Sequence, residues 1–216
     1  MSPPRSSQPA LPDPLPPGSV LAHVGVHKTG TTAIQSVLSQ QRSVLEAHGV
    51  VYPGVQGNHH KPAMALTGTK WGRVEKEGRP IPPRHWSDLV NAVQHTDKRV
   101  VISSEFFGDT RDPYGERFRD DLGKDRLHVV IGIRPLPHVL ASAWQQTLKL
   151  GRRNTFDQWL EKVYLGSRSA NPRAFWSRYD YGSAVRRWSD WVGRDQVSVI
   201  VLDDQDHSWQ DRKSVV

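Results

Sequence analysis

One stretch, residues 20–38, constrains the fold of this chain more than any other. It reads VLAHVGVHKTGTTAIQSVL: an apolar run, a short polar turn, and a segment with apolar residues at helical spacing. The pattern predicts a buried strand over residues 20–26, a tight turn over 27–30, and a helix from Thr31 to about residue 48. A glycine-containing turn between a strand and a helix presents backbone N–H groups to an anion such as phosphate or sulfate. The stretch therefore predicts an α/β fold with an anion site at the end of its first strand.

The turn departs from the common nucleotide-binding pattern G-x-x-x-x-G-K-[ST]. Gly25 and Gly30 have the right spacing, but Thr31 stands where that pattern has its lysine, and Lys28 lies before the second glycine. A lysine at this earlier position favours a ligand shorter than a nucleoside triphosphate. The alternative is a plain glycine turn with Thr31 or Thr32 as the helix cap, which requires no ligand.

Composition limits the classes of function. The chain has 216 residues, which suits one globular domain, and a formal net charge of +7, which fits either a soluble basic surface or a polyanionic ligand. Its basic residues are scattered, so we expect a small phosphorylated ligand and no nucleic acid. There is no cysteine, which excludes disulfides and thiol chemistry. No apolar run approaches the roughly 20 residues of a membrane span, and no export signal is recognisable, so we expect a cytoplasmic location.

The chain divides into three parts. Residues 1–18 are proline-rich and predict a disordered leader. Residues 19–202 alternate strand and helix patterns and predict one α/β domain with a parallel sheet. Within it, residues 56–83 are rich in glycine and proline and predict a long loop. Residues 203–216 follow no pattern of the domain and form a tail.

A carboxylate follows the strand predicted at residues 99–103. Glu105 lies just past its C-terminal end, where open α/β sheets place their chemistry. The neighbouring phenylalanines favour a partly desolvated carboxylate that acts as a general base; the alternative is a carboxylate at a helix start. Three histidines are lesser candidates for the base: His27, His59 and His60. His59 and His60 are adjacent and could bind a metal ion, but no third ligand follows at a suitable spacing.

A second strand-to-helix junction carries two more candidate ligands. The strand predicted at residues 127–133 ends at Arg134, and Ser142 follows eight residues later on the next helix. A forked guanidinium and a hydroxyl together suit a phosphate group. The run I-R-P-L-P-H-V-L-A-S resembles the 3′-phosphate motif of sulfotransferases that use 3′-phosphoadenosine 5′-phosphosulfate, and the turn H-K-T-G-T-T resembles their 5′-phosphosulfate loop.

This resemblance implies a fold, a reaction and a site. The fold is a three-layer α/β/α sandwich with a central parallel sheet, similar to P-loop nucleoside triphosphatases. The reaction is transfer of a sulfuryl group to a hydroxyl or amine of a small-molecule or carbohydrate acceptor, with adenosine 3′,5′-bisphosphate as product and no metal ion. Lys28 and Glu105 are the implied catalytic residues. The implied ligands of the donor are Lys28, Thr29, Gly30, Thr31, Thr32, Arg134 and Ser142.

The resemblance extends over about residues 20–202. The family pattern continues with another helix and a further cofactor-binding segment, which residues 203–216 do not match, so the C-terminal part of the pattern looks truncated. Two other functions therefore stay open. One is a non-catalytic or inactive relative that binds a nucleotide anion. The other is a P-loop kinase, which would bind ATP with magnesium.

Overall fold

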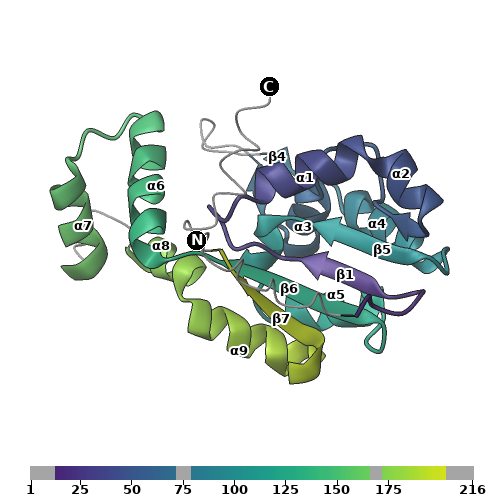
Figure 1. Ribbon diagram of the computed structural model, residues 1–216. Helices are drawn as coiled ribbons and strands as arrows, with labels where there is room; N and C mark the ends of the chain where they lie inside the picture. The colour runs from purple at the N-terminus through teal and green to yellow at the C-terminus, as the bar shows by residue number, and fades with distance from the viewer. Residues whose placement is uncertain (1–12, 72–78, 166–171, 203–216) are drawn as a thin grey trace, which may run out of the picture.

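A parallel sheet organises the chain (Figure 1). The computed structural model describes residues 13–71, 79–165 and 172–202. Within them, five parallel strands form the main sheet in the order β2-β5-β1-β6-β7, and β3 and β4 form a separate antiparallel pair. The strands are β1 Val20–His23, β2 Val50–Val51, β3 Lys70–Trp71, β4 Arg79–Pro80, β5 Arg99–Ser103, β6 Leu127–Ile133 and β7 Val197–Val201.

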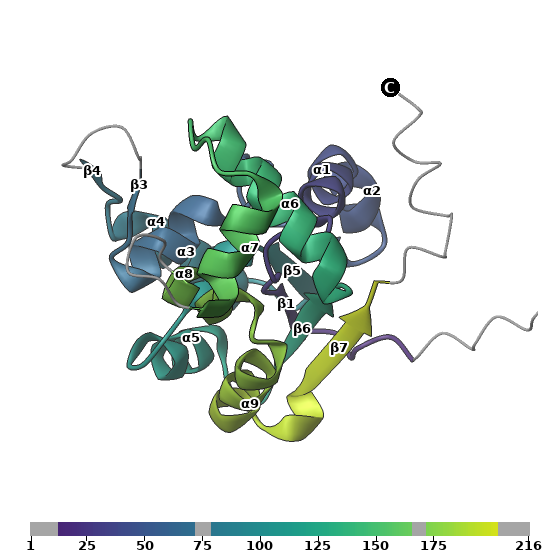
Figure 2. The same ribbon diagram turned by 90° about the vertical axis from the view of Figure 1, so that its left-hand side faces the viewer.

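Helices cover both faces of this sheet. Figure 2 shows α1 and α2 on one face and α3, α4, α5 and α9 on the other, while α6 and α7 project from the C-terminal edge as a helical arm (Figure 1). The predicted three-layer α/β/α architecture is confirmed. The helices are α1 Thr31–Gln40, α2 Arg42–Ala47, α3 His60–Thr67, α4 Arg84–Gln94, α5 Tyr114–Leu122, α6 Leu136–Lys149, α7 Phe156–Leu165, α8 Pro172–Tyr179 and α9 Tyr181–Val192, with short 3₁₀ helices η1 Glu105–Asp109 and η2 Arg194–Gln196.

The first strand lies at the centre of the sheet. In the register of the sheet, Ala22 pairs with Ile102 of β5 and with Val129 of β6, and all three residues are fully buried. A parallel strand buried on both faces is largely apolar, and β1 has three apolar residues before its last residue, His23, whose Nδ1 lies 2.8 Å from the Ser103 hydroxyl. The chain leaves β1 toward β2 and β5 on one side, and later reaches β6 and β7 on the other. The end of β1 is therefore the point at which the strand order reverses, where α/β proteins bind their ligands.

Aromatic side chains fill the core beneath the sheet. Trp86 of α4 stacks on Phe118 of α5 at a ring distance of 5.7 Å, and Phe118 meets Trp188 of α9 at 5.1 Å. Phe107 of η1 packs edge-on against Phe118 at 5.0 Å. Since these rings come from four different elements, their burial fixes η1 against the helical layer, and η1 carries Glu105.

Several local predictions were wrong. The helix expected from Thr31 to about residue 48 is interrupted at Gln41, which separates α1 from α2. Residues 56–83, predicted as a loop, contain α3 and the β3–β4 pair, because Ala63, Met64 and Leu66 bury an apolar face. The helix α8 was not predicted at all.

The described part of the chain begins near the sheet and ends just after its outer strand. Residues 1–12 of the predicted leader and the tail at 203–216 lie outside the described residues, but Leu15 accepts a hydrogen bond from Arg99 Nε, so residues near 15 are bound to the sheet. The outer strand β7 exposes Val199, Ile200 and Val201. No helix in the described part of the chain is long and apolar enough to cross a membrane.

Candidate functional site

The β1–α1 loop, residues 24–30, has an unusual backbone. Lys28 has a φ of 68°, in the left-handed region that only glycine occupies without cost. Gly25 and Gly30 also have positive φ values, of 92° and 76°. Gly30 is the N-cap residue of α1, and no side chain caps the helix. The alternative of a turn capped by Thr31 or Thr32 is therefore wrong, since these are the first helical residues, and the N-terminus of α1 keeps its N–H groups available to an anion.

The threonines of the loop have different surroundings. Thr29 Oγ1 donates a hydrogen bond to the carbonyl of Val26 at 2.7 Å, and Thr31 Oγ1 makes a longer one to the same oxygen at 3.5 Å. Both residues are buried, whereas Thr32 is exposed beside the start of α1. Two of the predicted ligands thus use their hydroxyl groups to brace the loop.

The side chain of Lys28 reaches across to the helical arm. Its Nζ donates a hydrogen bond to Gln146 Oε1 of α6 at 3.0 Å. Burial lowers the pKa of Lys28, the positive charge of Lys149 lowers it further, and the negative charge of Glu105 raises it. The ammonium group therefore lies near a second cation and a carboxylate, in a position where an anionic ligand would relieve the repulsion.

Arg134 and Ser142 lie on the arm side of the same edge. Arg134 follows β6, and its carbonyl accepts a hydrogen bond from the Tyr181 hydroxyl at 2.9 Å. Ser142 is half-buried on α6, one helical turn before Gln146, so both lie on the same face of that helix. Because Gln146 binds Lys28, this face of α6 looks toward the β1–α1 loop.

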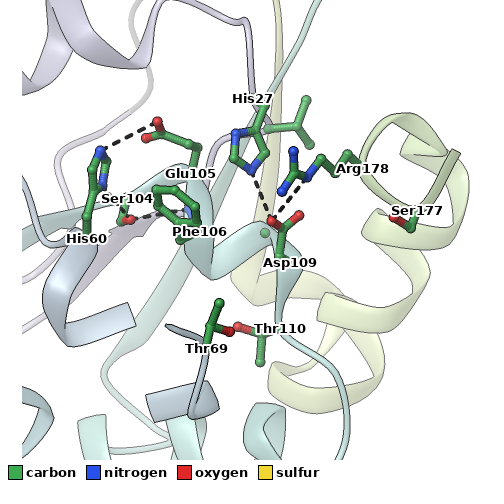
Figure 3. A network of polar contacts seen from close by, with 12 residues as sticks. His27, His60, Thr69, Ser104, Glu105, Phe106, Asp109, Thr110, Ser177 and Arg178 are labelled. Carbon is green, nitrogen blue, oxygen red and sulfur yellow. Dashed lines mark hydrogen bonds and ion pairs between the residues drawn. The ribbon is translucent and has the colours of Figure 1, made fainter. Parts of the chain in front are cut away.

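Glu105 begins η1, immediately beside the loop. An added Cβ at Gly25 would lie 2.9 Å from the Cα of Glu105, so the two backbones approach each other closely. Glu105 Oε2 accepts a hydrogen bond from Gln35 Nε2 at 3.3 Å, and Oε1 lies 3.6 Å from His60 Nε2. Figure 3 shows the carboxylate and the imidazole facing each other. The structure thus brings together Glu105 and His60, two of the candidate bases.

The imidazole of His60 is held from its other side as well. Its Nδ1 lies 2.9 Å from the hydroxyl of Ser104, which also accepts a hydrogen bond from the Phe106 N–H. Burial lowers the pKa of His60, while the nearby carboxylate of Glu105 raises it and His27 lowers it. A largely neutral imidazole beside a carboxylate is suited to exchanging a proton with it.

A second imidazole–carboxylate pair lies beyond the ring of Phe106. His27 Nε2 is 3.1 Å from Asp109 Oδ2, and Arg178 Nε of α8 is 3.3 Å from the same oxygen. Burial alone would raise the pKa of Asp109, but the hydrogen bond and charge of His27, with the arginines nearby, lower it. Phe106 contacts both imidazoles edge-on, at 5.3 Å from His27 and 4.9 Å from His60 (Figure 3). The cluster links the β1–α1 loop, η1, α3 and α8.

His59 has a structural environment. Its Nδ1 accepts a hydrogen bond from the N–H of Ser103, and its Nε2 lies 3.1 Å from the carbonyl of Pro53. Burial lowers the pKa of His59 to about 4, so the ring is neutral near pH 7. Both ring nitrogens are occupied by backbone groups, which leaves none for an acceptor. Among the residues with described positions, no three His, Asp or Glu side chains gather in a way that could hold a metal ion.

Four residues of the site were not identified from the sequence. Gln35 lies outside the apolar face of the helix that begins at Thr31, so its spacing gave no signal that it is buried. The other three come from helices whose register against the loop only the fold determines: Asp109, Gln146 and Arg178.

Comparison with known proteins supports the fold. No protein-family model and no curated protein matches the chain. Among solved structures, the chain is similar to a sulfotransferase from Alicyclobacillus acidocaldarius, with a TM-score of 0.54 and 18% sequence identity, over 89% of this chain and 76% of that one. At this identity the similarity establishes a shared fold, which agrees with the architecture that the two sequence motifs imply.

Proposed function

We propose that this chain is a sulfotransferase that moves a sulfuryl group from 3′-phosphoadenosine 5′-phosphosulfate to a hydroxyl or amine of a small-molecule or carbohydrate acceptor. The observation that carries the proposal is the close approach of an open anion-binding loop to a carboxylate. Lys28 lies on the left-handed turn before an uncapped helix, and the backbone of Glu105 contacts the first glycine of the same loop. Sulfuryl transfer requires both groups, a cation for the leaving oxygen and a base for the acceptor.

The donor set fits the proposed ligand. The N–H groups at the start of α1 and the ammonium of Lys28 suit a phosphosulfate. Arg134 and Ser142, on the arm side of the site, would hold the 3′-phosphate. When bound, 3′-phosphoadenosine 5′-phosphosulfate supplies the activated sulfuryl group. Charge balance on the leaving oxygen and removal of the acceptor proton are assigned to side chains of this protein.

Two side chains have distinct chemical roles in the proposal. Lys28 balances the negative charge that grows on the leaving oxygen, as cations do in phosphoryl transfer. Glu105 accepts the proton that the acceptor hydroxyl or amine loses as its bond to sulfur forms. The neighbouring imidazole of His60, 3.6 Å away, is suited to pass that proton on toward Ser104 and solvent.

Calorimetric titration tests the ligand class directly. We expect the purified chain to bind adenosine 3′,5′-bisphosphate more tightly than 5′-AMP or ATP with magnesium, and Lys28→Ala to weaken that binding. Preference for ATP with magnesium would replace the proposal by a kinase. A chain that binds the bisphosphate but transfers no sulfuryl group from 3′-phosphoadenosine 5′-phosphosulfate to any of a panel of phenols, amines and sugars would be a non-catalytic relative.

A further inference from the structure

A single glutamine connects the helix after the loop with the carboxylate. Gln35 lies on α1 and is only 4% exposed. Its Nε2 lies within hydrogen-bonding distance of three oxygens: the carbonyl of Ser103 at 3.4 Å, the Ser103 hydroxyl at 3.3 Å, and Glu105 Oε2 at 3.3 Å. A buried amide with several acceptors around it has little freedom to rotate. Its position is therefore set by the end of β5, and it directs its donors toward Glu105.

The two oxygens of Glu105 have different partners. Gln35 binds Oε2, and His60 Nε2 lies 3.6 Å from Oε1. The amide carries no charge and cannot take a proton from the carboxylate, so its contribution is to orientation. Water is a poor substitute, because the glutamine side chain is buried. Without the amide, rotation about the terminal bond of Glu105 would no longer be opposed from this side.

We propose that Gln35 is a positioning residue that holds the carboxylate of Glu105 against His60 in the orientation needed to accept a proton. The consequence for catalysis rests on the proposed function, whereas the geometric part does not. His60 reports on that geometry, since Glu105 faces its Nε2 while Ser104, Phe106 and His27 surround the rest of the ring.

Nuclear magnetic resonance titration of the His60 imidazole tests the geometric part. Glu105→Gln should lower the titration midpoint of His60, because the carboxylate stabilises the protonated ring. Gln35→Met, which keeps the length of the side chain but donates no hydrogen bond, should lower it in the same direction by a smaller amount. In the double variant, Gln35→Met should add nothing to the effect of Glu105→Gln.

A matched control separates this effect from a general disturbance of α1. Gln40 lies on the same helix, is exposed, and donates a hydrogen bond to Ser36, far from His60 in the sequence and on the outer side of α1, so Gln40→Met should leave the His60 midpoint unchanged. An unchanged midpoint in Gln35→Met, beside a lowered one in Glu105→Gln, would overturn the proposal. An equal change in Gln40→Met would overturn it as well.

Turnover tests the catalytic consequence. With 4-nitrophenol as acceptor probe, Gln35→Met should lower kcat roughly tenfold to a hundredfold, while the KM for the donor and the calorimetric affinity for adenosine 3′,5′-bisphosphate stay the same. Gln35→Leu, which also lacks a donor and adds no charge beside Glu105, serves if the methionine variant does not fold. Unchanged kcat in a folded Gln35 variant would refute the inference. Failure of the unmodified chain to bind the bisphosphate would instead refute the proposed function. The His60 titration would still test whether Gln35 orients the carboxylate of Glu105.

Discussion

The left-handed backbone of Lys28 predicts that two substitutions there will differ in stability but not in turnover. At a φ of 68°, a residue with a Cβ costs about 1–2 kcal/mol that glycine does not. Glycine loses about 0.5–1 kcal/mol more conformational entropy on folding. Lys28→Gly should therefore be more stable than Lys28→Ala by about 0.5–1 kcal/mol. Both variants lose the same hydrogen bond to Gln146, so their difference isolates the backbone.

Paired unfolding measurements test this prediction. For a chain of 216 residues, the difference corresponds to a Tm about 1–4 °C higher for the glycine variant. Both variants should lose roughly 10³-fold in turnover, since neither supplies a cation. At Lys162, inside α7, the order should reverse, because glycine in a helix is about 1 kcal/mol worse than alanine. Equal or greater stability of Lys28→Ala would refute the left-handed loop.

Three further predictions follow from the same contacts. Glu105→Gln should lower turnover about 10²–10⁴-fold with calorimetric affinity for adenosine 3′,5′-bisphosphate preserved; unchanged turnover would transfer the base to an imidazole. The pKa of the His59 imidazole is about 4 in the folded chain and 6.5 in the unfolded chain. As the pH falls from 6.5 to 4 the unfolded chain is protonated first, so the free energy of unfolding should fall by up to roughly 3 kcal/mol. Denaturant titrations at several pH values should show a smaller loss in His59→Gln. Gly25→Ala should lower the free energy of unfolding by roughly 2–4 kcal/mol, because the methyl group would meet Glu105, whereas Gly54→Ala, with a φ of 74° and nothing within 4 Å, should lose only about 0.5–1 kcal/mol.

Local signals were sufficient for the central part of the fold. The strands β5 and β6 were predicted at their observed bounds because apolar residues dominate both, whereas β1 ends at His23, three residues before its predicted end. The helical spacing of α9 is visible in the sequence in the same way, since four buried residues recur on one face. The short helix α3 was missed, since a helix of two turns between glycine-rich segments has too few residues to establish a period.

Some residues of the candidate site could likewise be predicted from the sequence, and others could not. Glu105 and Arg134 lie within two residues of the ends of β5 and β6, and Lys28 lies in the loop after β1, so the parallel sheet alone predicts that they meet at one edge. Gln146 of α6 contacts Lys28 of the loop and Arg178 of α8 contacts Asp109 of η1, and both contacts depend on how these helices pack against the end of the sheet. No periodicity in the sequence encodes that packing. The roles of Thr29 and Thr31 were likewise not predictable, because a hydroxyl group serves a ligand or a loop carbonyl equally well.

Glycine determines how closely the two halves of the site approach each other. A Cβ at Gly25 would lie 2.9 Å from the Cα of Glu105, and one at Gly108 would lie 2.7 Å from the carbonyl oxygen of Val24. Both contacts join the β1–α1 loop to η1, and a side chain at either position would force them apart. The β1–α1 loop and the short helix that carries Glu105 are thus packed backbone to backbone. A change that displaces one of them displaces the other, so in the proposed function ligand binding and proton acceptance would depend on the same contact.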